Sequence, residues 1–134
     1  MEEIRTAHAP PSAGPYSQGV RSGRLVFLAG QGPFSMTGER VGESFADQVR
    51  QTMDNLAAVA EAAGAGLADA VRIGVYLRSL DDFAELNELL AEYLSAPYPA
   101  RTTIQADLRG FDVEVDMVLE LPDGSVPSTQ GGRR

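Results

Sequence analysis

An arginine and a glutamate in the stretch from Pro99 to Leu121 have side chains suited to binding and converting a small organic acid. The planar guanidinium of Arg101 offers paired donors that match a carboxylate and fix its orientation as well as its position. Glu114 is able to orient water or to transfer a proton. Each residue also has an ordinary structural interpretation. Arg101 would then form a surface ion pair, and Glu114 would lie on the exposed side of a half-buried strand.

The same stretch predicts a β-hairpin with Arg109-Gly110 as the two central residues of its turn. Period-two alternation gives it one apolar and one polar face. The polar face is expected to carry Arg101, Thr103, Gln105, Glu114 and Asp116, and the apolar face Thr102, Ile104, Ala106, Val113, Val115, Met117 and Leu119. In this pairing Glu114 opposes Gln105, roughly 13 Å along the strand from Arg101, which leaves room for a substrate and a water molecule between the two.

The amino-acid composition excludes several kinds of catalytic and metal-binding site. The chain has no cysteine, which excludes thiol nucleophiles, disulfides and zinc-thiolate sites. All eleven basic residues are arginines, so neither a lysine Schiff base nor a P-loop lysine is available. Any imine handled by this chain therefore belongs to the substrate. The single histidine, His8, lies in a proline-rich segment, so a histidine-rich metal site cannot form within one chain.

The length and net charge of the chain further limit the number of domains and the partners to be expected. A chain of 134 residues with 43% hydrophobic residues suits one folded domain. Nineteen acidic against eleven basic residues give a net charge of −8, which disfavours nucleic acid as a partner. The N-terminus lacks the apolar run of a signal peptide, and no segment reaches the length of a membrane span. We therefore expect a cytoplasmic protein without membrane contacts.

Hydrophobic periodicity and breaker residues predict the elements that must hold these side chains. The predicted elements are two strands within 16–28, a helix over 44–63, a strand over 71–78, a helix over 79–94 and the two strands of the hairpin. Ser44 is the expected N-cap of the first helix, and Gly64 its stop. Between the second strand and the first helix lies the glycine-containing loop Ala29 to Pro33, where bare backbone is able to approach a ligand.

This order predicts a single α+β domain, residues 1–121, in which two helices pack on one face of a mixed β-sheet. Residues 122–134 are poor in apolar side chains, and we expect a flexible C-terminal tail. The uncovered face of the sheet would display Arg72 and Tyr76 beside the polar residues of the hairpin. A face of that composition suggests self-association.

Six short motifs occur in an order that resembles the RidA family, also called YjgF/YER057c/UK114. The motifs are G-P-Y-S-Q at 14–18, A-G-Q-G-P at 29–33, Q-T-M-D-N-L at 51–56, D-D-F-A-E-L-N at 81–87, P-A-R-T-T at 99–103 and V-E-V-D at 113–116. The resemblance spans about residues 4–121. It implies a chorismate-mutase-like α+β fold and a homotrimer with three sites in the clefts between subunits. It also implies hydrolytic deamination of reactive 2-enamine or 2-imino acids to 2-keto acids and ammonia, without a metal or an organic cofactor.

Position by position, the resemblance makes Arg101 the group that binds the substrate carboxylate and Glu114 the acid that positions water. Tyr16 and Gly30 would line the same pocket. From the residues alone, Tyr16 is equally suited to the core, and Gly30 to an ordinary turn.

Two further residues carry less defined roles. The backbone of Thr103 would help to hold substrate or water. Asn87 matches an asparagine often found near the site, although it is also a suitable structural hydrogen-bonding residue beside an apolar helix stripe. The sequence departs from the family pattern in a shorter turn between Arg101 and Glu114 and in Gly32, which replaces an aliphatic residue.

Two other functions stay open at this point. A trimeric protein of the same fold would be able to capture small carboxylates, as a sensor or chaperone-like protein, without converting them. Endoribonuclease activity is an older label attached to the family. The acidic charge, the single histidine and the absence of lysine argue against it.

Overall fold

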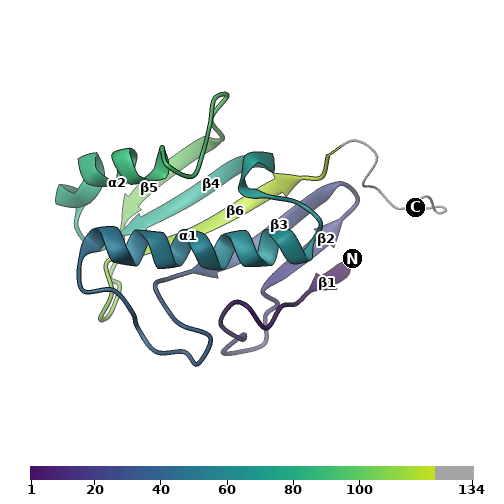
Figure 1. The fold of residues 1–134 in the computed structure, drawn as a ribbon, viewed down its shortest axis with the longest axis horizontal. Coiled ribbons are helices and arrows are strands. Elements are labelled where there is room, and N and C mark those ends of the chain that lie inside the picture. The colour runs from purple at the N-terminus through teal and green to yellow at the C-terminus, as the bar shows by residue number, and fades with distance from the viewer. Residues whose placement is uncertain (123–134) are drawn as a thin grey trace.

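The computed structural model describes residues 1–122 and shows one β-sheet with both helices on the same side (Figure 1). The elements are β1 (Glu2–Ile4), β2 (Gly19–Ser22), β3 (Leu25–Gln31), α1 (Phe45–Ala62), β4 (Ala70–Leu77), α2 (Phe83–Leu90), β5 (Ala100–Gln105) and β6 (Val113–Glu120), with 3-10 turns at Leu67–Asp69 and Leu80–Asp82. The strand order is β1-β2-β3-β6-β4-β5. Among the strands of residues 1–122, only β4 and β5 are parallel neighbours. The predicted α+β fold is confirmed, and the tail predicted from residue 122 onward lies outside the described residues but for Pro122.

The ends of α1 follow from local signals in the sequence. The Ser44 hydroxyl accepts a hydrogen bond from the Asp47 N–H over 3.0 Å, as an N-cap does. Gly64, at φ +81°, takes the left-handed conformation that ends many helices. The strand β1 has no counterpart among the predicted elements, because three residues are too few to give a periodic signal.

The predicted hairpin at Arg109-Gly110 is wrong, because β4 lies between β5 and β6. The chain leaves β4, passes through α2 and returns as β5, and a crossover of this kind produces parallel strands. The connection from β5 to β6 then passes the end of β4, where the Ala106 N–H donates to the Leu77 carbonyl over 2.9 Å and the Arg78 N–H donates to the Asp112 carbonyl over 3.0 Å. The turn signal marks a bend in this connection and not a strand pairing.

The register with β4 also decides which face each β5 side chain occupies. Arg101 pairs with Ile73 and Thr103 with Val75, and both partners are buried beneath the helices. Arg101, Thr103 and Gln105 therefore lie on the side of the sheet that carries the helices, opposite to the prediction. In β6 the prediction is confirmed, since alternate residues starting at Val113 are buried while Glu114 and Asp116 face the other way. Side chains alternate between the two faces in both strands, but the prediction placed β6 beside β5, where the structure has β4.

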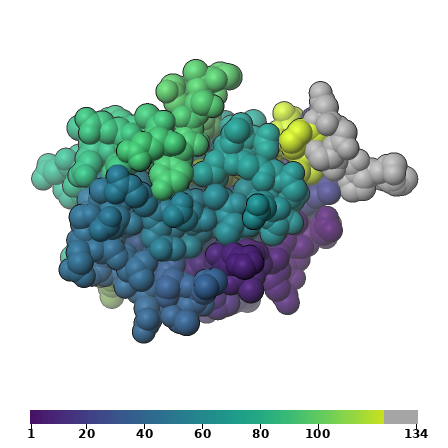
Figure 2. All heavy atoms as spheres, in the orientation of Figure 1, coloured from purple at the N-terminus to yellow at the C-terminus, as the bar shows by residue number. Residues whose placement is uncertain are grey.

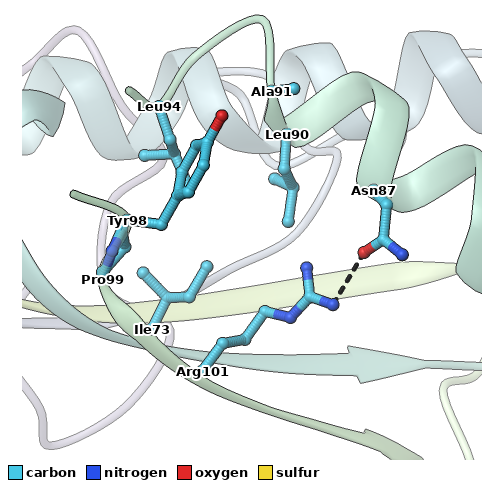
Figure 3. A pocket seen from close by; sticks show the side chains of 8 residues that line it. All are labelled: Ile73, Asn87, Leu90, Ala91, Leu94, Tyr98, Pro99 and Arg101. Atoms are coloured by element: carbon cyan, nitrogen blue, oxygen red, sulfur yellow. Dashed lines mark hydrogen bonds between the residues drawn. The ribbon is translucent and has the colours of Figure 1, made fainter. Parts of the chain in front are cut away.

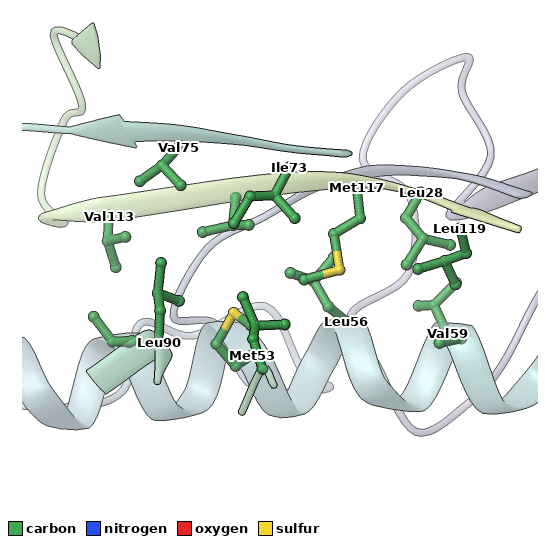
Figure 4. Packing of buried hydrophobic residues seen from close by; sticks show 14 of the residues in the cluster. Leu28, Met53, Leu56, Val59, Ile73, Val75, Leu90, Val113, Met117 and Leu119 are labelled. Carbon is green, nitrogen blue, oxygen red and sulfur yellow. The ribbon is translucent and has the colours of Figure 1, made fainter. Parts of the chain in front are cut away.

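The hydrophobic core lies between α1 and the sheet (Figure 4). The α1 side chains Val49, Met53, Leu56 and Val59 are completely buried, as their spacing of three and four residues predicts. They meet the inward side chains of β3, β4 and β6, among them Met117. From the helix side the helices and loops cover much of the sheet, and one end of β6, coloured yellow, lies at the surface (Figure 2).

Truncation of Met53 to alanine is expected to lower the free energy of unfolding by about 2–5 kcal/mol, because it removes buried contacts and leaves a cavity. Urea unfolding of both proteins measures the difference. The matched control is Met36→Ala: Met36 is 56% exposed, and its truncation should change stability by less than about 0.5 kcal/mol. Equal losses in the two variants would contradict this placement of the core.

Candidate functional site

One half of the candidate site surrounds Glu114. A cavity of about 310 Å³ is lined there by the loop from Pro10 to Ala13 together with Tyr16, Gly30 and Glu114. Tyr16 is 54% exposed, so it is a cavity residue and not a core aromatic. Its hydroxyl accepts a hydrogen bond from the Ala13 N–H over 3.1 Å, which ties the ring to the loop. Three residues selected separately in the sequence are thus brought together on one cavity wall.

Gly30 lies at an irregularity in β3. The pairing of β3 with β6 shifts between Leu28 and Gln31, and such bulges bend a strand and redirect its side chains. A Cβ atom on Gly30 would overlap the carboxylate of Glu114. Glycine is therefore required here by the close approach of the two strands, and its bare backbone borders the Glu114 carboxylate.

Two buried amide side chains fix the loops around this half of the site. Gln18 donates to the Pro10 carbonyl over 2.8 Å and so holds the N-terminal loop. Asn55 reaches out of α1 and donates to the Gly32 carbonyl over 3.2 Å and the Phe34 carbonyl over 2.8 Å. The hydrophobic period of α1 gives no indication of this second role, which depends on a loop more than twenty residues away in the sequence.

The electrostatic environment of Glu114 favours its protonated form. Burial raises the pKa of the Glu114 carboxyl, and the negative charge of Asp116 raises it further. Asp116 is held by the Gly74 N–H over 3.1 Å and by the Tyr76 hydroxyl over 2.7 Å. The hydrogen bond to Asp116, followed by burial, raises the pKa of Tyr76. Asp116 and Tyr76 were not among the predicted site residues, although the two-residue spacing of Glu114 and Asp116 places both on one face.

The other half of the site is built around Arg101 (Figure 3). Its guanidinium donates to the Asn87 side-chain oxygen over 2.7 Å and lies 5.3 Å from the centre of the Phe83 ring. Phe83 is 41% exposed beneath this cation. No ion pair found within residues 1–122 involves Arg101. Its partners are thus neutral, and its charge stays available for an anionic ligand.

Thr103 follows two positions after Arg101 on the same face of β5. Its hydroxyl oxygen is buried and has no hydrogen-bond partner within the described residues. A buried hydroxyl without a partner loses the hydrogen bonds that water would give it. The hydroxyl of Thr103 is therefore enclosed on the helix side of β5 without a compensating hydrogen bond from residues 1–122.

The two halves do not meet within one chain. Arg101 is level with Ile73 on β4 and, through it, with Met117 on β6. Two strand spacings, together with the offset from Met117 to Glu114, separate the two backbone positions by roughly 14 Å. The side chains also point to opposite faces of the sheet. A pocket with Arg101 and Glu114 at its two ends, as the hairpin predicted, therefore does not form within a single subunit.

Neither a metal centre nor a membrane segment is found in the described part of the chain. Within residues 1–122, no group of three or more histidine, cysteine, aspartate or glutamate side chains is placed to hold a metal ion. None of the helices in this range is both long enough and apolar enough to cross a bilayer.

The fold and the two half-sites define a small α+β protein of the RidA type. Residues 6–120 match the family model described as endoribonuclease L-PSP, which covers most of the chain. The protein belongs to this family, also known as the YjgF/RidA family, and the membership indicated by the six motifs is confirmed.

Relatives and a solved structure give the same family. A RutC family protein of Pyrococcus horikoshii is 41% identical over 117 residues, which cover 87% of this chain and 93% of the relative. A protein of Dermatophagoides farinae named 2-iminobutanoate/2-iminopropanoate deaminase is 39% identical over 119 residues, covering 87% and 93%. The crystal structure of RidA from the Antarctic bacterium Psychrobacter is 40% identical, with a TM-score of 0.85 and coverage of 90% of this chain and 100% of that one.

Replacement of Asp116 by asparagine is expected to lower the pKa of Glu114, because it removes the nearby negative charge. The pKa should stay above its ordinary value, since burial is the larger cause and persists in the variant. Carbon-13 NMR titration of the glutamate side-chain carboxyls measures the change. Asp107→Asn, at a side chain that is 87% exposed, is the control and should leave the Glu114 pKa unchanged. An unchanged or raised pKa in Asp116→Asn would contradict the electrostatic coupling.

Proposed function

We propose that the protein hydrolyses reactive 2-enamine and 2-imino acids, such as the imine derived from 2-aminoacrylate, to 2-keto acids and ammonia. The observation that carries the proposal is the guanidinium of Arg101, which has neutral partners and no carboxylate partner among residues 1–122. A relative that covers most of the chain bears the name of a 2-iminobutanoate/2-iminopropanoate deaminase. Small 2-imino and 2-keto acids would be its partners, and the reaction needs no cofactor.

The complete site would form between two copies of the chain. Arg101, Asn87 and Thr103 would come from one subunit, while Tyr16, Gly30 and Glu114 would come from its neighbour. The opposite faces of Arg101 and Glu114 support this arrangement, because one subunit alone cannot place both against one small substrate. The open face of the sheet adds support, since Phe27 is 41% and Ile104 47% exposed there. A closed ring of three copies, a homotrimer, would contain three equivalent sites.

In the proposed reaction Arg101 binds the substrate carboxylate with paired hydrogen bonds, and Asn87 and Phe83 keep the guanidinium in place. Protonated Glu114, favoured by its raised pKa, donates its proton to the imine nitrogen. The carbon becomes more electrophilic, and water adds to it while the Glu114 carboxylate accepts a proton from that water. Glu114 then returns the proton to the amine nitrogen. The C–N bond breaks as the hydroxyl oxygen forms the C=O bond and gives its proton to the Glu114 carboxylate, so ammonia and the 2-keto acid leave and Glu114 is again protonated.

Arg101→Ala should lower kcat/KM for imine hydrolysis roughly 10- to 150-fold, because charge-assisted hydrogen bonds contribute about 1.5–3 kcal/mol. The imine is generated by an amino-acid oxidase, and its decay is followed against the spontaneous rate. Arg109→Ala is the matched control, since the Arg109 side chain is 90% exposed and forms an ion pair with the exposed Asp107. No acceleration by the unaltered protein would refute the enzymatic proposal. Binding of pyruvate without acceleration would instead support a carboxylate-binding protein.

A site shared between subunits is tested by mixing two inactive variants. Arg101→Ala and Glu114→Gln chains, unfolded together and refolded in equal amounts, should recover about a quarter of the unaltered activity, because one site in four then combines an intact Arg101 with an intact Glu114. Each variant refolded alone supplies the baseline. A mixture no more active than the two separate variants would show that both residues act from the same chain.

A further inference from the structure

The Arg101 half of the site opens into a second cavity, of about 410 Å³ (Figure 3). Asn87 and the Arg101 guanidinium form its polar end. The side chains of Ile73, Leu90 and Leu94 lie along the rest of it, and the ring of Tyr98 closes the far end. The cavity therefore has a cation at one end and hydrocarbon along its length.

The side chains that form the walls of this cavity differ in their exposure to water. Ile73, Leu90 and Leu94 are at most 9% exposed, so the core holds them in fixed positions. Tyr98 is 63% exposed, which leaves a large aromatic surface in contact with water. An apolar ligand in the cavity would bury part of that ring and contact the small surface that the three buried side chains present to the cavity.

The volume of the cavity is larger than the smallest substrates would fill. An imine derived from alanine carries a single methyl group beside its carboxylate and would leave most of 410 Å³ empty. Cavities of this size in proteins hold considerably larger ligands. Each further CH2 group buried against such walls strengthens binding about fourfold.

We propose that this cavity receives the side chain of the substrate, and that the protein prefers 2-imino acids with branched aliphatic or aromatic side chains. The inference rests on the proposed function, because it takes the carboxylate of the same substrate to lie on Arg101. The carboxylate binds the Arg101 guanidinium, and the side chain extends past Leu90 toward Tyr98. The preference for these substrates comes from the position of the Arg101 guanidinium, which has only neutral partners within residues 1–122, at the end of an apolar cavity.

The test compares imines generated from leucine, phenylalanine and alanine. The unaltered protein should hydrolyse the leucine-derived imine with a kcat/KM about 10- to 50-fold higher than the alanine-derived one, given three additional carbon atoms in the cavity. Ala91 lies at the rim of the cavity. Ala91→Leu, which adds volume there, should lower the leucine-to-alanine ratio about tenfold. Tyr98→Ala, which removes the end wall, should lower the same ratio.

Ala62→Leu is the matched control, because it makes the same change at an exposed position in the last turn of α1 and should leave the ratio unchanged. No hydrolysis of any imine would refute the proposed function itself. Hydrolysis with an equal or higher rate for the alanine-derived imine, or with a ratio unaffected by Ala91→Leu, would refute the side-chain cavity alone. A crystal structure in which a side chain of a second copy fills the cavity would also overturn it.

Discussion

The crossover from β4 through α2 to β5 is the constraint on which both halves of the site depend. It brings β5 parallel to β4 and fixes Arg101 beside Ile73, on the side of the sheet that carries α2. Asn87 and Phe83 on α2 therefore meet the guanidinium. The same crossover leaves the other edge of β4 free to pair with β6, which turns Glu114 to the opposite face. This single crossover thus places Arg101 and Glu114 on opposite faces of the sheet.

Buried amide side chains hold the loops around the candidate site in place relative to the core. Asn55 extends from the buried face of α1 to two loop carbonyls, and Gln18 holds the N-terminal loop in the same manner. Gln48, also on α1, accepts from the Asp112 N–H over 2.8 Å and so holds the connection between β5 and β6. Such bonds are strong constraints, because breaking one leaves a buried polar group without a partner. These bonds consequently hold the loops in place relative to the core.

The two halves of the site are electrostatically complementary. Arg101 is stabilised by an amide oxygen and an aromatic ring, which hold the guanidinium without cancelling its charge. Glu114 is half-buried near a second carboxylate, and both effects favour the neutral acid. A permanent cation and a readily protonated acid are what hydrolysis of an anionic imine requires of its catalyst. Because the two groups are separated within one chain, the proposed reaction would require assembly of copies.

The sequence by itself determined the local elements and most of the candidate residues. The N-cap Ser44, the apolar period of α1 and the alternation of β6 are local signals, because each depends on the conformational preferences of a few neighbouring residues. The six motifs indicated the family and selected Arg101, Glu114, Tyr16 and Gly30. Asp116 and Tyr76 were expected on the polar face but not selected for the site, because their hydrogen bond joins residues forty positions apart. Only the tertiary structure decided the face on which Arg101 lies. Alternation requires neighbouring side chains to point to opposite faces of the sheet, but the pairing with the partner strand decides which residues face the helices. The local turn signal placed β6 beside β5, whereas β4 occupies that position in the structure.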